Sequence, residues 1–207
     1  MPPVLESLAA DERRQLRRSS QPRRIEPMKA TLAKEPFDDE GWIFERKLDG
    51  IRCLAYRDGD RVTLLSRTAH ELGRSYPELV EGIAAQRCPD FVIDGEIVAF
   101  EGQVTSFARL QGRMQLTDPD AARRTGIEVF LYVFDLIHIE GYDVREVALR
   151  LRKALLRRAI DHDPYPLSPR VKTWQAILDT IEPPRVREPL PEPNVYAAPR
   201  AGRRRRG

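Results

Sequence analysis

Hydrophobic and polar residues alternate along several short runs of this sequence. Residues 51–55 and 62–64 show this period of two, and Asp58-Gly59 lies between them. An Asp-Gly pair between two alternating runs is a strong hairpin signal, so two antiparallel strands are predicted here. A second hairpin is predicted to turn at Glu101-Gly102. The apolar run 129–139 predicts a central strand, which the Glu140-Gly141 pair ends.

Other segments repeat their apolar residues at the spacing of a helix. One helix is predicted to start between Ser75 and Glu78, with Ser75 as its cap and Glu78 completing a capping box, and with Leu79 and Ile83 facing inward. A helix over 145–160 carries an apolar stripe and places its arginines on a solvated face. Further short helices are predicted over 10–18, from Ser106 and from Thr173.

Hairpins with a few intervening helices predict one α+β domain, built on antiparallel sheets with flanking helices. At 207 residues the chain is long enough for one domain with a substantial core, or for one domain with tails. The sequence contains no run of 18 apolar residues, so no membrane span is predicted, and the charged N-terminus is unlike a secretory signal. Two cysteines and three scattered histidines predict neither a disulfide framework nor a zinc site, which fits a reducing cytosol. The expected location is cytoplasmic and nucleoid-associated.

The net charge of +3 hides an uneven distribution. Residues 1–24 carry six arginines and a net charge of +3, and residues 185–207 carry seven arginines and a net charge of +5. The rest of the chain is therefore at −5. Basic ends attract phosphate backbones through counterion release, without reading base sequence. The alternative interpretation, a solubilising or accidental tail, applies with equal force to the four arginines 203–206.

The strongest chemical signal is the segment 45–52, Glu-Arg-Lys-Leu-Asp-Gly-Ile-Arg. It follows a strand-like segment over 42–44. A lysine amine such as that of Lys47 is a good nucleophile only when neutral, which requires burial or neighbouring cations. Asp49-Gly50 supplies a turn, after which Arg52 can point back toward a ribose or phosphate with its planar donor fork. The competing interpretation is a surface lysine before a hairpin, because a bare K-x-D-G match is common by chance.

This segment resembles the K-x-D-G-x-R motif of the ATP-dependent DNA ligases, within the covalent nucleotidyltransferase superfamily. The likeness is greatest to the ligase domain of bacterial end-joining enzymes, and it runs from about Ile25 to about Ile160. In that family the motif lysine, here Lys47, attacks the α-phosphate of ATP and forms a lysyl-AMP phosphoramidate. Arginine at the sixth motif position, Arg52, favours a DNA ligase over an RNA ligase or a capping enzyme.

Three further segments match the family in the expected order. Arg67 closes the strand after Lys47, where the family has an arginine that contacts substrate phosphate and nucleotide. Residues 91–100 resemble the family's D-G-E strand, whose glutamate is Glu96 here, and Tyr-Val-Phe-Asp-Leu at 132–136 resembles the strand whose ring, Phe134, stacks on adenine. Each residue also has an ordinary interpretation: a solvated strand end, a lone carboxylate near a turn, and a core ring. Four matches in order argue against coincidence.

The resemblance implies a nucleotidyltransferase (ATP-grasp-like) adenylation fold, with ATP and Mg²⁺ as cofactors. It implies nicked or broken duplex DNA as the partner, in DNA repair and recombination. Lys47 is the implied catalytic residue, Glu96 the implied metal ligand, and Glu45 or its backbone is implied to lie near the exocyclic amine of adenine. The implied nucleotide-binding residues are Glu45, Lys47, Asp49, Arg52, Arg67, Glu96 and Phe134.

Four regions are predicted along the chain. They are a basic flexible lead-in over 1–24, a partial adenylation domain over 25–160, a non-matching segment with a short helix over 161–182, and a Pro/Arg-rich disordered tail over 183–207. No match is found for the family's E-G-x-x-x-K and K-x-K segments or for its OB-fold domain. The only lysines beyond residue 141 are Lys153 and Lys172, at an unrelated spacing. A domain incomplete at its C-terminal end is therefore expected, with a separate chain or other end-joining proteins as partners. The alternative is a truncated, non-catalytic remnant that binds ATP or DNA weakly.

Overall fold

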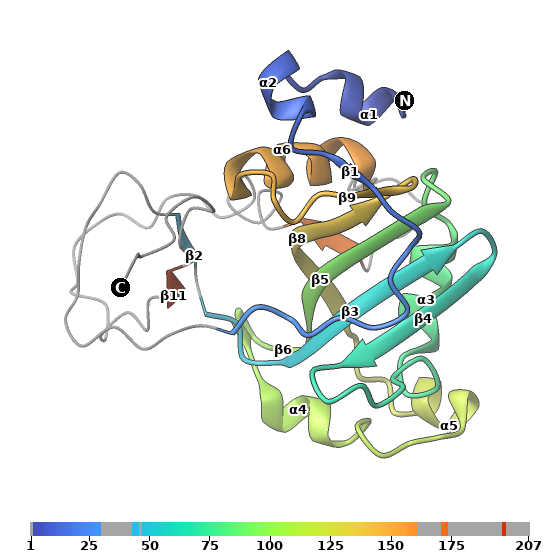
Figure 1. Ribbon diagram of the computed structural model, residues 1–207. Helices are drawn as coiled ribbons and strands as arrows, with labels where there is room; N and C mark the ends of the chain where they lie inside the picture. Colours follow the sequence, from blue (N-terminus) through green and yellow to red (C-terminus); the bar gives the residue numbers. More distant parts are fainter. Residues whose placement is uncertain (1, 30–42, 46, 161–170, 174–195, 198–207) are drawn as a thin grey trace, which may run out of the picture.

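A seven-stranded sheet forms the centre of the computed structural model, which describes residues 2–29, 43–45, 47–160, 171–173 and 196–197 (Figure 1). The strands are β1 (Arg17–Arg18), β2 (Phe44–Glu45), β3 (Ile51–Asp58), β4 (Arg61–Ser66), β5 (Asp90–Val98), β6 (Phe100–Glu101), β7 (Val104–Thr105), β8 (Phe130–Ile139), β9 (Tyr142–Asp143), β10 (Val171–Thr173) and β11 (Tyr196–Ala197). The helices are α1 (Pro3–Glu6), α2 (Ala10–Arg13), α3 (Pro77–Ala84), α4 (Phe107–Gln111), α5 (Pro119–Arg124) and α6 (Leu149–Ala159). No described helix is long and apolar enough to cross a membrane.

The strand order of the sheet is β1-β9-β8-β5-β3-β4, and β10 also pairs with β8. Every pair is antiparallel except β10 with β8, so the predicted α+β fold on antiparallel sheets is confirmed. The β3–β4 hairpin turns at Gly59, whose φ of +61° is the left-handed conformation that glycine adopts without strain. The second hairpin, β6–β7, turns at Gly102 as predicted, and β8 ends at Ile139, just before the Glu140-Gly141 turn.

The two faces of the sheet are covered differently. Alternate residues of β3, β5 and β8, such as Cys53, Ile93 and Val133, point into the main core, where α3 and α6 pack against the strands. The opposite face carries a smaller apolar cluster of Leu54, Tyr56, Val92 and Ile137. In Figure 1 the described chain after β1, up to residue 29, crosses this second face; its Ile25 packs on the cluster and donates its N–H to the Tyr56 hydroxyl.

Strand β8 contains two bulges where it pairs with β5. The register pairs Gly95 with Val133 but Asp94 with Asp135, so Phe134 is an extra residue on β8. A second shift between Val92 and Ile93 makes Ile137 the other extra residue. A bulge bends its strand and changes the direction of the extra side chain. Phe134 therefore owes its direction to an irregularity in the pairing, rather than to plain alternation.

The prediction that residues 1–24 form a flexible lead-in is wrong for the described residues 2–24. Leu5 is fully buried and Leu8 is 5% exposed, and α1 packs against α6. Strand β1 then pairs with β9, and the side-chain amide of Gln21 donates to the carbonyl of Arg57 and to Asp90. The spacing of the two leucines provides a small apolar face, which the many arginines of this segment obscure in the sequence. The helix predicted over 10–18 is limited to α2 because the chain leaves it for β1.

Two helix-level predictions are also wrong in detail. Helix α3 starts at Pro77 with Tyr76 as its N-cap, while the Ser75 hydroxyl donates to the carbonyl of Leu116 and Glu78 pairs with the buried Arg113. Both side chains expected to form a capping box are therefore used in tertiary contacts. By contrast, the predicted inward positions Leu79 and Ile83 are fully buried, and Ser106 caps α4 by accepting from the N–H of Arg109.

On α6, the expectation of solvated arginines fails at Arg152. This residue is 5% exposed, and its guanidinium makes two 2.8 Å hydrogen bonds to the buried carboxylate of Asp135 on β8. A buried guanidinium requires such a partner, because an unpaired charge in the interior is costly. The pair therefore fixes α6 against β8 at one rotation and one height.

The predicted C-terminal regions overlap the described residues at two points only. Val171–Thr173, within the segment 161–182, forms β10, so Thr173 ends a strand there. Tyr196–Ala197, within the tail predicted to be disordered, forms β11 and pairs with β2. Such short pairings use backbone groups, and they leave no hydrophobic pattern in the sequence. The helix predicted from Thr173 to Ile181, the rest of the tail and Trp42 lie outside the described residues.

Candidate active site

The loop that carries Lys47 is tied to the hairpin and helix beside it. Lys47 lies exposed between β2 and β3, two residues before Asp49. The Asp49 carboxylate accepts a 2.9 Å hydrogen bond from the N–H of Phe107, the first residue of α4, and the Asp49 N–H donates to the Thr105 hydroxyl at 3.0 Å. The aspartate of the motif therefore serves as an anchor that fixes the loop against the β7–α4 junction.

Two glycines of the site are required by close backbone approach. A Cβ on Gly50 would lie 2.2 Å from the carbonyl oxygen of Ile97 and 2.8 Å from Cγ of Glu96. A Cβ on Gly95 would lie 2.6 Å from the carbonyl oxygen of Tyr132. Neither distance is compatible with a side chain, so Gly50 brings the lysine loop directly onto β5, and Gly95 lets β5 and β8 approach beside the bulge at Phe134.

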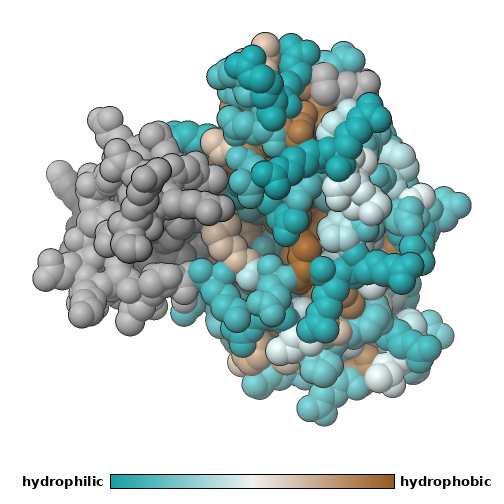
Figure 2. Space-filling model, viewed as in Figure 1, coloured by the Kyte–Doolittle hydropathy of each residue, from teal (hydrophilic) through white to brown (hydrophobic). Residues whose placement is uncertain are grey.

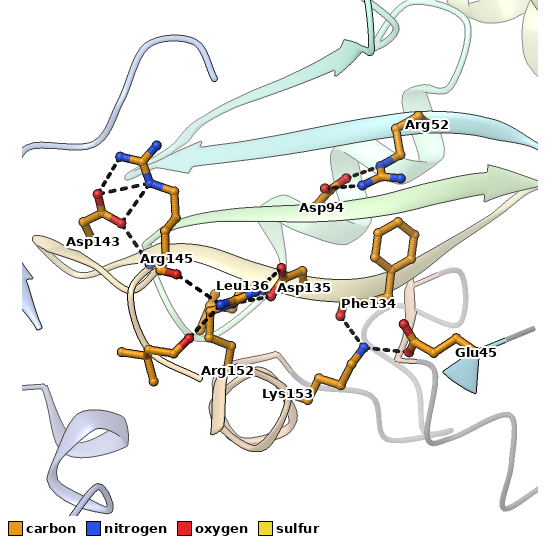
Figure 3. Close-up of polar contacts among 11 residues, drawn as sticks. Glu45, Arg52, Asp94, Phe134, Asp135, Leu136, Asp143, Arg145, Arg152 and Lys153 are labelled. Atoms are coloured by element: carbon orange, nitrogen blue, oxygen red, sulfur yellow. Dashed lines mark hydrogen bonds and ion pairs between the residues drawn. The ribbon is translucent and has the colours of Figure 1, made fainter. Parts of the chain in front are cut away.

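Arg52 is held in a fixed position on the second face of the sheet. Its Nε and Nη2 atoms lie 2.6 Å from the two carboxylate oxygens of Asp94, whose side chain is 2% exposed (Figure 3). The guanidinium carbon lies 4.6 Å from the centre of the Phe134 ring. Burial alone would lower the pKa of Arg52, but the hydrogen bonds and charge of Asp94 keep that pKa above its ordinary value. Arg52 therefore stays charged while lying over an aromatic ring.

Glu96 lies directly across the β3–β5 ladder from Arg52. Burial raises the pKa of Glu96 from 4.5 to about 7, against the opposing charge of Arg52, while the nearby carboxylates of Asp94 and Asp49 raise it further. Arg67, exposed just beyond β4, has a weaker lowering effect on the same carboxyl. A carboxyl with a pKa near neutrality is one that a bound cation can deprotonate, which is typical of a functional site.

The described residues include no cluster of three or more His, Cys, Asp or Glu side chains that could hold a metal ion. Mg²⁺ in nucleotide sites is commonly bound by one or two carboxylates, several waters and the substrate phosphates. Glu96 fits that mode of binding, because the residue is partly exposed and lies on the face where Arg52 and Phe134 meet.

Phe134 and Glu45 share one partner that the sequence did not suggest. Lys153 on α6 donates to Oε1 of Glu45 at 2.6 Å and to the carbonyl oxygen of Phe134 at 2.7 Å (Figure 3). Asp94 is the other residue missed, although it lies two positions before Glu96 and so on the same face of β5. That spacing was a signal for Asp94. Lys153 had none, because 108 residues separate it from Glu45.

The structure thus brings several predicted site residues together. Arg52, Glu96 and Phe134 lie on one face of adjacent strands, and Asp49 and Arg67 lie close enough to Glu96 to affect its pKa. Glu45 joins them through Lys153. The result is a flat aromatic ring, a fixed guanidinium and a carboxyl whose pKa is about 7, beside a loop with an exposed lysine. This combination can bind a planar base with an attached polyphosphate.

Comparisons with known proteins find matches among the DNA ligases. A family model described as ATP dependent DNA ligase domain matches residues 26–181, which extends past the limit near Ile160 expected from the motifs. A probable DNA ligase of Saccharopolyspora erythraea is 34% identical over 147 residues, covering 68% of this chain and 28% of that protein. DNA ligase C1 of Mycolicibacterium smegmatis is 30% identical over 167 residues, covering 77% of this chain and 45% of that protein.

Among solved structures, the ligase domain of M. tuberculosis LigD is 29% identical, with a TM-score of 0.46, and the match covers 56% of this chain and 36% of that one. The chain spans 28% to 45% of the length of the two ligases above. The family model, in contrast, matches most of the chain, and its range contains the lysine loop, the D-G-E strand and the Phe134 strand. The chain therefore belongs to the family of ATP-dependent DNA ligase domains.

Proposed function

We propose that this chain transfers AMP from ATP to its own Lys47, the first step of DNA ligation. The observation that supports the proposal best is the meeting of Arg52, Glu96 and Phe134 on one face of the sheet. These residues come from three strands and match three separate ligase segments, and the lysine loop lies directly against β5 at Gly50. A surface lysine before an ordinary hairpin would not need that arrangement.

The chemistry assigned to Lys47 is attack on a phosphate. The ammonium of the exposed Lys47 first loses one proton to water. The neutral amine then attacks the α-phosphorus of ATP and loses a second proton to water as the phosphoramidate forms. A P–N bond forms, the P–O bond to the β-phosphate breaks, and pyrophosphate leaves. When bound, Mg²⁺ neutralises charge on the phosphates. Glu96, in its ionised form, is assigned to hold that ion. Arg67 is assigned to contact phosphate or ribose from beyond β4.

The adenine is assigned to the ring of Phe134 and to the carboxylate of Glu45. Stacking a base on an aromatic side chain contributes about 1–3 kcal/mol and does not depend on the identity of the base. Discrimination therefore has to come from the edge of the base, where Glu45 can accept from the 6-amino group. Arg52, fixed by Asp94 beside the ring, is placed to contact the ribose.

We infer that the DNA partner is contacted in part by the N-terminal segment. All six arginines of residues 1–24 are exposed, although the segment itself is packed on the domain. Figure 2 shows hydrophilic residues over most of the described surface on this side, including the segment at the top. Arginines on a docked segment are held at a fixed position, so they can neutralise phosphates without the cost of ordering a free tail.

Labelling with ATP tests the adenylation step. The purified chain, incubated with Mg²⁺ and ATP labelled at the α-phosphate and then denatured, should retain label on Lys47. Lys47→Ala should retain none, and the exposed Lys29→Ala serves as a matched control that keeps it. Label that persists in Lys47→Ala would refute the assignment. Bound ATP without covalent label in the wild type would favour the non-catalytic alternative.

Salt dependence tests the DNA surface separately. Changing Arg13, Arg14, Arg17 and Arg18 to Gln should weaken duplex binding and reduce the slope of log affinity against log salt, by about 0.9 for each phosphate that the variant no longer neutralises. A control pair on α5, Arg123→Gln with Arg124→Gln, removes exposed charge elsewhere and should leave the slope nearly unchanged. An equal reduction in both variants would show a general charge effect.

A further inference from the structure

Lys153 joins the two groups to which recognition of adenine is assigned. Its ammonium lies 2.6 Å from the carboxylate of Glu45 and 2.7 Å from the carbonyl oxygen of Phe134. The side chains of Lys153 and Glu45 are 14% and 25% exposed, so the contact is largely shielded from water. Glu45 comes from β2 and Phe134 from β8, and Lys153 reaches both from α6 (Figure 3). One charged group thus links an acceptor for the edge of the base to a platform for its face.

The bulge explains why the carbonyl of Phe134 needs such a donor. Phe134 is the extra residue on β8, and β5 supplies no partner residue at that position. An extra residue in a bulge interrupts the ladder of backbone hydrogen bonds. Lys153 donates to the carbonyl there, so the backbone that directs the ring is held from the helix side. Without that bond, the direction of the Phe134 ring would be less well defined.

The same ammonium orients Glu45. Strand β2 is only two residues long, so its backbone alone fixes the glutamate side chain poorly. A charge-assisted hydrogen bond in a partly buried place is about twice as strong as a neutral one and prefers one geometry. The position of Lys153 is itself fixed, because the adjacent Arg152 forms the buried ion pair that locks α6 on β8. The same helix, α6, therefore orients both the Glu45 carboxylate and the Phe134 ring.

We propose that Lys153 is a positioning residue for base selection, which holds the Glu45 carboxylate at the correct height beside a base stacked on Phe134. The inference rests on the proposed function, since it assumes that ATP is the nucleotide bound. Adenine presents a 6-amino donor to the carboxylate, whereas guanine presents a 6-oxo acceptor, and unsubstituted purine presents neither. A carboxylate at the wrong height above or below the plane of the base would lose its hydrogen bond from the 6-amino group of adenine. It would also repel the 6-oxo group of guanine less strongly.

The test compares three triphosphates by equilibrium binding: ATP, GTP and purine riboside triphosphate, which lacks the amino group. In the wild type, ATP should bind more tightly than either competitor. Lys153→Met should reduce both preferences by roughly tenfold, the effect of one hydrogen bond to a charged group. Lys153→Arg, which keeps a positive donor, should restore most of the preference. Arg158→Met, at an exposed position of the same helix, is the matched control and should leave it unchanged.

A structural role alone predicts a different result. Lys153→Met would then weaken all three triphosphates equally and leave the preferences intact, which would overturn the inference. Glu45→Gln should reduce the preferences like Lys153→Met, and the double variant should lose little more, because both act on one contact. If Lys153→Met does not fold, Lys153→Gln takes its place in the same comparison. A wild type that binds none of the triphosphates refutes the proposed function; one that binds ATP without preference refutes the inference alone.

Discussion

Replacing Glu96 with Gln should stabilise the fold at alkaline pH and change little at acidic pH. The pKa of Glu96 is raised by burial from 4.5 to about 7, so the folded protein binds this proton more tightly than the unfolded chain does. Between those two values the folded state carries more protons, and its stability falls as pH rises. A tenfold change in proton affinity corresponds to about 1.4 kcal/mol, so the full loss is about 3 kcal/mol above pH 7. Glutamine has a similar shape and no proton to lose.

Urea unfolding of both proteins at pH 5 and at pH 8 measures this difference. The variant should gain about 1–3 kcal/mol over the wild type at pH 8, since local relaxation and solvent reduce the full value. At pH 5 the gain should be small. Other groups that titrate in this range cancel in the comparison, because both proteins share them. An identical difference at the two pH values would mean that Glu96 is ionised throughout, and the account of its environment would be refuted.

Three more outcomes follow from the packing and the site. Leu5→Ala should destabilise the domain by about 2–5 kcal/mol in urea unfolding, whereas an undocked N-terminal segment would give no change. Gly95→Ala should cost about 1–3 kcal/mol, because the new Cβ would lie 2.6 Å from the carbonyl oxygen of Tyr132; wild-type stability would contradict the close approach of β5 and β8. Phe134→Ala should weaken ATP binding by about 1–3 kcal/mol with a smaller effect on the melting temperature, and a loss of binding explained wholly by unfolding would make the ring structural.

The sheet was largely predictable because its signals are local. Alternation marked β3 and β4, the Asp-Gly pair marked their turn, and Gly102 and Gly141 fell where the second hairpin and the end of β8 were expected. Where side chains found partners far away, local rules failed. Ser75 and Glu78 have the spacing of a capping box, but the contacts to Leu116 and to the buried Arg113 take both of them. Arg152 has the sequence context of a solvated helix and is instead buried against Asp135.

The candidate site shows the same division. Motif order placed Lys47, Arg52, Glu96 and Phe134 in one site, and the structure brings the last three together. The order of the motifs could not show that Asp94 fixes Arg52 over the ring, since that contact depends on the pairing of β3 with β5. Nor could it show that Lys153 connects two of the predicted residues. A contact across 108 residues of sequence has no local pattern, and only the packing of α6 on β8 creates it.

Strand β1 lies at one end of the sheet and consists of two exposed arginines, with the guanidinium of Arg18 5.5 Å from the ring centre of Tyr142. The unpaired side of a terminal strand is a place where another chain can add and begin aggregation. Among the described residues no strand pairs with the outer side of β1, which is two residues long with two positive side chains, so a second copy approaching in the same way would meet like charge. Self-association through this edge is opposed, while a polyanion is attracted to it. Neutralising both arginines would therefore make the protein more prone to aggregate at low salt, even if the fold were unchanged.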